Sequence, residues 1–99
     1  MFPTSFMNFW LSEKFLNLKF FSKKKEGETY YLEKKFSFKN FSESQKFVNK
    51  VGDISEKQGH HPDIIFGWGY AKIQIFTHKI KGLVESDFIL AARIDKIIC

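Results

Sequence analysis

The sequence predicts an α+β protein, a two-layer sandwich of a four-stranded antiparallel sheet with helices packed on one face. Three observations support this prediction. Apolar residues alternate over residues 29–38 and 70–78, as half-buried strands require. They recur at helical spacing elsewhere, and a length of 99 residues fits one domain over residues 1–99. The expected order of elements is α-β-β-α-β-β-α.

The first third of the chain predicts a short helix and then a hairpin. Helical spacing of four and three residues is found at Leu11, Phe15 and Leu18. A turn is expected over residues 23–28, which hold a run of lysines and Gly27. The strand at 29–38 has one apolar face that only Lys34 interrupts, and an earlier strand near residues 20–21 can pair with it.

The period changes to that of a helix after residue 40. Ser42 and Gln45 fit a capping box, in which the two side chains satisfy free amides at a helix start. Apolar residues then recur at helical spacing, and the helix should run to about Lys57 with Gly59 as its stop.

The last third of the chain predicts two strands and a final helix. Gly67 and Gly69 flank Trp68 in a loop or an irregular strand, and residues 70–78 form the clearest strand of the sequence. Gly82 makes a turn, and a last helix runs from residue 85 or 86 to the end.

The chain carries a formal net charge of +5 and has a pI of about 9.4, so an anionic partner has to be considered. Almost all the excess is lysine, and Arg93 is the single arginine. Bases and phosphates are read mainly by arginine forks, so we predict no nucleic-acid partner. No apolar stretch reaches membrane-spanning length, and the single cysteine, Cys99, fits a reducing cytoplasm.

Three histidines are the candidates for chemistry. His60 and His61 follow the predicted helix and are stiffened by Pro62, and His78 ends the last predicted strand. Histidine exchanges protons near neutral pH, and no serine or cysteine forms a nucleophilic set with them, so general acid–base chemistry is indicated. Ordinary surface histidines are one alternative. Zinc is another, but no histidine pair at i, i+4 supports it, and we predict no metal.

Two carboxylates lie near the histidines in the sequence. Glu56 precedes His60 by four residues, on the same face if the helix extends that far, and Asp87 opens the last helix. Each carboxylate can orient an imidazole by accepting its second N–H. Each can equally be an ordinary helix charge, because acidic residues near a helix start are favourable in any case.

This arrangement resembles the signature of the pterin-4a-carbinolamine dehydratases over roughly residues 30–98. The signature is Glu56-x-x-x-His60-His61-Pro62, followed by Trp68, His78 and Asp87. Residues 36–41, Thr77, Gly82-Leu83 and Leu90-Ala91 also resemble the family. The sequence departs from it at Gly59, where a polar side chain is common, and at Val84, where serine or threonine often caps the last helix.

The resemblance implies a hydro-lyase that converts 4a-hydroxytetrahydrobiopterin to quinonoid dihydrobiopterin. Such an enzyme needs no cofactor, forms homodimers or homotetramers, and regenerates the pterin used by an aromatic amino-acid hydroxylase. By position, His60 and His78 would form the acid–base pair, and His61 would bind and orient the pterin. The remaining substrate-binding positions implied by the resemblance are Gly59, Phe76, Thr77 and Trp68, the last as a wall against the ring.

Two other interpretations stay open. One is a non-catalytic binding module or dimerisation cofactor, although an intact set of histidines has no purpose in a pure scaffold. The other is a dehydratase-like protein that acts on a different pterin. The sequence does not predict the C6 substituent of the pterin, because the histidines select for the ring more than for its side chain.

Overall fold

The computed structural model describes residues 21–98, which form four strands, two α-helices and one short 3-10 helix. The expected helix at Leu11, Phe15 and Leu18 lies outside the described residues. From the first strand onward, the order of strands and α-helices is the predicted one. The elements are β1 Ser22–Glu26, β2 Thr29–Ser37, α3 Phe41–Gln58, β3 Asp63–Gly67, β4 Tyr70–Ile75, η2 His78–Ile80 and α4 Glu85–Ile98.

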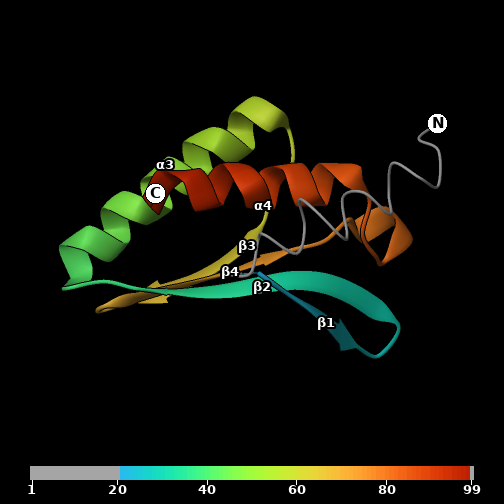
Figure 1. Cartoon of the computed structure of the whole chain (residues 1–99), viewed down its shortest axis with the longest axis horizontal. Coiled ribbons are helices and arrows are strands. Elements are labelled where there is room, and N and C mark those ends of the chain that lie inside the picture. The colour runs from blue at the N-terminus through green and yellow to red at the C-terminus, as the bar shows by residue number, and fades with distance from the viewer. Residues whose placement is uncertain (1–20, 99) are drawn as a thin grey trace.

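The four strands form one antiparallel sheet in the order β1-β2-β4-β3. Helices α3 and α4 both lie on one side of this sheet, which gives the two layers seen in Figure 1. The predicted α+β fold class is therefore confirmed for the described residues. Neither of these two helices combines the length and the apolar character that crossing a bilayer requires.

The core fills the space between the sheet and the two helices. Alternate residues of the central strands β2 and β4 point into it, as the sequence predicts. The buried strand residues are Leu32, Phe36, Ala71, Ile73 and Ile75, and the helices contribute Phe47, Val51, Phe88, Leu90, Ala91 and Ile94. Lys34 interrupts this apolar face, and its ammonium group forms an ion pair with Asp95 on α4, with 2.9 Å between Nζ and Oδ1.

The lysine run belongs to strand β1, so its expected placement in a turn is wrong. Lys23, Lys24 and Lys25 pair across the ladder with Leu32, Tyr31 and Tyr30. Nζ of Lys24 lies 3.0 Å from Oε1 of Glu33, and the ammonium groups of the other two lie over the Tyr30 ring. Such cross-strand contacts outweigh the low strand propensity of lysine. The turn is confined to residues 27–28, where Gly27 has φ 61°.

The N-cap of helix α3 lies two residues before the predicted one. Asn40, not Ser42, is the N-cap, and its Oδ1 accepts a hydrogen bond of 2.9 Å from the backbone N–H of Glu43. The Glu43 side chain in turn accepts from the backbone N–H of Lys39. This differs from the expected box in that Glu43 accepts from the residue before the cap, while asparagine caps the helix as well as serine does.

The end of α3 follows the prediction at Gly59. This glycine has φ 70°, and its N–H donates back to the carbonyl groups of Ser55 and Glu56. The N–H of His60 also donates to the Ser55 carbonyl, which completes a Schellman motif. The left-handed residue turns the chain away from the helix axis and towards β3.

A pair of glycine substitutions, one within α3 and one at its C-cap, tests this description. No atom lies within 4 Å of a Cβ built at Gly59 or at Gly52, so backbone conformation alone decides each outcome. Gly59→Ala should lower the free energy of unfolding by about 1–2 kcal/mol through left-handed strain. Gly52→Ala should raise it by about 1 kcal/mol, because alanine is the better helix former. Urea unfolding measures both, and a change of the same sign in the two variants would contradict the assignment.

The outer face of the sheet yields a prediction about acid stability. The pKa of Glu33 is lowered from 4.5, mainly by the hydrogen bond from Gln74 and further by Lys24, while burial opposes the shift. The ionised Glu33 side chain therefore contributes its full stabilisation at pH values above 4.5, and this contribution is lost as the pH falls through the lowered pKa. The stability gap between wild type and Glu33→Gln should narrow over this acidic range in urea unfolding. Glu28→Gln, at an exposed turn position, is the control that should show no such narrowing.

Candidate active site

The pairing of β3 with β4 brings the histidines to one end of the sheet. The two strands are antiparallel, with Asp63 opposite Gln74. Continuing this register beyond Asp63 places His60 and His61 beside the segment that follows β4, at residues 76–78. The hairpin register thus unites residues that are almost twenty positions apart in the sequence.

The three histidines line a single hollow of about 390 Å³, which we call the histidine cleft. It receives His60 and His61 from the α3–β3 connection and His78 from the start of η2. The other residues that line it are Gly59, Pro62, Asp63, Phe76, Thr77 and Lys79. The volume falls in the range of small-molecule sites, about 300–1,000 Å³.

His60 is the most firmly held of the three imidazoles. Its Nε2 lies 2.5 Å from Oδ1 of Asp87, and the two side chains are 16% and 0% exposed. An ionised carboxylate can only accept, so this contact assigns the proton to Nε2 and leaves Nδ1 as the other ring nitrogen. A buried carboxylate is therefore positioned to fix the orientation of the imidazole.

The second oxygen of Asp87 anchors the carboxylate itself. Oδ2 accepts a hydrogen bond of 2.6 Å from the backbone N–H of Val84 and one of 3.0 Å from Oγ1 of Thr77. The first of these is the reciprocal half of a capping box, in which the side chain of the third helical residue reaches back to the backbone amide that precedes the helix. Asp87 thus performs both of the roles weighed from the sequence, as a helix charge and as the partner of a histidine.

Gln58 ties the two helices together beside this carboxylate. Its Nε2 donates a 3.0 Å hydrogen bond to the backbone carbonyl of Ser86, which joins the last residue of α3 to the first turn of α4. Sequence reasoning did not identify this residue, since a glutamine at a helix end carries no pattern of its own. The bond links the chain that leads to His60 with the helix that carries Asp87.

Glu56 contacts His61, not His60. Its Oε2 lies 2.5 Å from Nε2 of His61, and both side chains are largely exposed to solvent. The four-residue spacing from His60 does not apply because the helix ends before that histidine and Gly59 reverses the chain. Exposed pairs of this kind contribute at most about 1 kcal/mol, so Glu56 can orient His61 only weakly.

His78 occupies the first position of η2, beyond the end of its predicted strand. Strand β4 ends at Ile75, and reciprocal backbone hydrogen bonds between Thr77 and Gly82 then close a short loop. The imidazole of His78 stacks on the ring of Phe76, with centroids 4.3 Å apart and planes 4° from parallel. This stack holds an otherwise exposed imidazole at the edge of the histidine cleft.

The structure does not bring Trp68 to the histidine cleft. Gly67 pairs with Tyr70, which places Trp68 in the two-residue turn at the opposite end of the β3–β4 hairpin. Its side chain is 73% exposed. The five residues of β3 separate the two ends by roughly 16 Å at the usual rise of an extended strand. Within one chain, the tryptophan therefore forms no wall of the cleft.

Asp63 and Lys79 line the cleft but were not among the predicted site residues. Only their position in the sequence could have indicated them, because Asp63 directly follows His60-His61-Pro62 and Lys79 directly follows His78. Among the residues that the structure describes, no three histidine, cysteine, aspartate or glutamate side chains form a group able to hold a metal ion.

The fold and the cleft define a small α+β protein whose histidines surround a ligand-sized hollow, one of them backed by a buried carboxylate. The family model described as pterin 4 alpha carbinolamine dehydratase matches residues 14–97. The chain belongs to this family, which confirms the resemblance seen in the sequence.

Two relatives show the extent of the sequence similarity. The chain is 54% identical over 70 residues to a Rubrobacter xylanophilus protein provisionally named pterin-4-alpha-carbinolamine dehydratase, covering 71% of this chain and 65% of that protein. A protein of the same provisional name from Alkaliphilus metalliredigens is 54% identical over 67 residues, with 68% and 60% covered. The chain thus spans less than two thirds of the length of these relatives.

Two solved structures share the fold. A transcriptional coactivator/pterin dehydratase from Brucella melitensis superposes with a TM-score of 0.77 at 26% identity, covering 97% of this chain and 96% of that one. A pterin dehydratase-like protein, identified as a RuBisCO assembly factor in the alpha-carboxysome, superposes with a TM-score of 0.63 at 29% identity. That match covers 76% of this chain and 87% of the other.

Asp87→Asn tests the anchoring role of the carboxylate. An amide offers one accepting oxygen where the carboxylate offers two, so either His60 or the Val84 and Thr77 donors lose their partner. Because the group is buried, the free energy of unfolding should fall by about 1–3 kcal/mol. Urea unfolding provides the measurement. Asp53→Asn, on the exposed face of α3, is the matched control and should change stability by less than about 0.5 kcal/mol. An equal change in the two variants would contradict the anchoring role.

Proposed function

We propose that this protein dehydrates a 4a-hydroxytetrahydropterin in the histidine cleft. One observation carries the proposal: His60, His61 and His78 line the same hollow, and a buried Asp87 lies behind one of them. Membership of the pterin 4 alpha carbinolamine dehydratase family supports the choice of substrate. Where an aromatic amino-acid hydroxylase produces the carbinolamine, the reaction would return its pterin to the quinonoid dihydro form.

The reaction is the loss of water and needs one proton donor and one proton acceptor. The lone pair of a ring nitrogen forms a double bond to C4a while the C4a–O bond breaks. The hydroxyl takes a proton from an acid and leaves as water, and a ring N–H gives a proton to a base. No electrons are gained or lost overall, so acid and base groups of the chain can supply the chemistry.

His60 is suited to one of these roles because its orientation is fixed before substrate binds. With Nε2 directed at Asp87, Nδ1 is the nitrogen left to exchange a proton with the pterin. Asp87 favours the imidazolium that forms when His60 accepts a proton, and it is held in place by Thr77 and the Val84 amide. Such preorganised charge needs no rearrangement during the reaction.

His78 is proposed as the second member of the acid–base pair. It reaches the same cleft from the other chain segment, so a flat ring bound in the cleft can meet one histidine from each segment. The stack on Phe76 restrains the imidazole without occupying either ring nitrogen. His61, exposed and paired with Glu56, is proposed to bind and orient the pterin.

A non-catalytic binding role is the second candidate. One solved relative is described as a pterin dehydratase-like RuBisCO assembly factor, so the fold also occurs under a role other than dehydration. For this chain, such a role would leave the His60–Asp87 contact without a purpose in chemistry. Activity of the folded protein distinguishes the two candidates.

Histidine substitutions test the proposed chemistry. Freshly generated 4a-hydroxytetrahydropterin is mixed with the protein, and its decay to the quinonoid product is followed by stopped-flow ultraviolet absorbance. His60→Ala and His78→Ala should each lower kcat by about 10²–10⁴-fold, the usual contribution of a positioned acid or base. His61→Ala is the comparison variant and should chiefly raise KM.

Circular dichroism should first show that each variant is folded. No acceleration by the folded wild type would reject the dehydratase and favour the binding role. Acceleration that survives both substitutions would keep the activity but reject the assigned acid–base pair.

A further inference from the structure

The end of the β1–β2 hairpin carries lysines gathered around one tyrosine. The ammonium groups of Lys23 and Lys25 lie 4.8 Å and 5.2 Å from the centre of the Tyr30 ring. The backbone N–H of Tyr30 donates a 3.3 Å hydrogen bond to the carbonyl of Lys81, so the loop that holds η2 lies beside the hairpin, as Figure 1 shows. We call this surface the lysine patch. It consists of Lys23, Lys25, Tyr30, Lys79, Ile80 and Lys81, all of them exposed.

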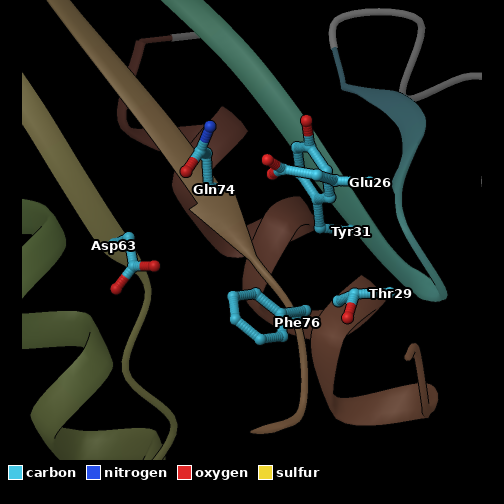
Figure 2. A pocket seen from close by; sticks show the side chains of 6 residues that line it. All are labelled: Glu26, Thr29, Tyr31, Asp63, Gln74 and Phe76. Atoms are coloured by element: carbon cyan, nitrogen blue, oxygen red, sulfur yellow. The ribbon is translucent and has the colours of Figure 1, made fainter. Parts of the chain in front are cut away.

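The positive charge of the lysine patch is not balanced by carboxylates. Within residues 21–98, no lysine of the patch forms an ion pair with an acidic side chain. Strand alternation puts Lys24 and Glu26 on the opposite face of the hairpin, because Lys23 pairs with the buried Leu32. Glu26 lines a second hollow on that face, which Figure 2 shows. The patch is therefore an exposed concentration of like charge, suited to an anionic partner.

The lysine patch also exposes apolar surface. The side chain of Ile80 is 56% exposed and that of Tyr30 is 39% exposed. Tyrosine combines an apolar ring with a polar tip, and it is enriched where proteins meet the surface of a membrane. Lysine stems can cover apolar surface while their ammonium groups stay in water. Positive charge beside an exposed tyrosine and isoleucine is a composition that suits a layer of lipid headgroups.

Lys81 adopts a backbone conformation that is unfavourable for its residue type. It has φ 52°, and among the residues that the structure describes it is the only one other than glycine with a positive φ. This left-handed conformation favours glycine, because a side chain crowds the backbone there. Glycine would serve stability better at this position, so a lysine there indicates a role for its charge.

We infer that the lysine patch is a docking surface for an anionic lipid bilayer, to which the protein binds peripherally. The residue types favour a bilayer over other anionic partners. Protein interfaces are depleted in lysine, and bases are read mainly by arginine forks, which the patch lacks. A leaflet of anionic lipids attracts positive charge of either kind, so lysine is sufficient.

The bilayer would lie beside the opening of the histidine cleft. Lys79 belongs to the lysine patch and also lines the cleft, next to His78. Binding through the patch would therefore give the cleft a fixed direction relative to the membrane surface. The inference goes beyond the proposed function and does not depend on it.

Vesicle flotation with the full chain tests the inference. Vesicles of phosphatidylcholine alone are compared with vesicles of phosphatidylcholine and phosphatidylglycerol in equal parts, at low and at physiological salt. Wild type should float with the anionic vesicles and not with the neutral ones. The bound fraction should fall as salt is raised, because salt screens the attraction between exposed charges.

Paired lysine substitutions separate the patch from the net charge of the protein. Lys23→Gln combined with Lys25→Gln should lower the partition coefficient about 25-fold, since each lysine near an anionic surface contributes about fivefold. Lys46→Gln combined with Lys50→Gln is the matched control. It removes the same charge from exposed positions of α3 and should change the partition coefficient by less than about twofold.

Lys81→Gly should move stability and binding in opposite directions. It should raise Tm by roughly 4 °C through relief of left-handed strain, and still lower the partition coefficient about fivefold. Circular dichroism on heating gives Tm for the same samples. A loss of binding in a more stable protein cannot arise from unfolding.

Loss of vesicle binding confined to the patch variants supports the docking surface. Three results would overturn it. They are absence of wild-type binding to anionic vesicles, equal losses in the two double variants, and tighter binding to polyglutamate or duplex DNA than to vesicles at the same salt. The last result would assign the patch to a protein or a nucleic acid instead. Because no measurement uses dehydration, failure of the proposed function is detected separately.

Discussion

The buried carboxylate of Asp87 receives contacts from three separate parts of the chain. It meets the backbone N–H of Val84 at the start of α4, the Thr77 hydroxyl after β4, and the imidazole of His60 after α3. A buried carboxylate without partners would cost several kcal/mol, so no one of these segments can withdraw without affecting the other two. The position of the His60 imidazole is therefore coupled to the start of α4 and to the segment that follows β4.

Two backbone constraints bring the partners of Asp87 within reach. The left-handed Gly59 ends α3 and turns the chain so that His60 reaches Asp87 on α4. A hydrogen bond from Gln58 to the Ser86 carbonyl joins the two helices at the same place. The antiparallel register of β3 and β4 then sets the histidine segment beside the segment that leads to His78. Neither constraint uses a histidine side chain, so the backbone alone sets the directions from which the imidazoles enter the cleft.

Most of the fold could be predicted from the sequence because its strongest patterns are also its most buried elements. Ala71, Ile73 and Ile75 alternate on the core face of β4 as their spacing predicts. The predicted N-cap of α3 was wrong because several polar residue types can cap a helix, and Asn40 takes this position in place of Ser42. The strand of lysines and the exposed turn position of Trp68 depend on cross-strand pairing, which no single segment of sequence records. The double role of Asp87 likewise needs three distant segments to meet.

The two hollows rest on different parts of the architecture, and this separation bears on how such a site can change. The histidine cleft is built on the coupled ends of α3, β4 and α4, where a substitution at Asp87 or Thr77 disturbs stability and geometry together. A second hollow, of about 280 Å³, draws Glu26 and Thr29 from the end of the β1–β2 hairpin. Among the residues that the structure describes, the hydrogen-bond partners of the Asp87 side chain are His60, Thr77 and Val84, and none of these belongs to the hairpin. Substitutions in the hairpin can therefore leave the contacts among His60, Asp87 and Thr77 in place.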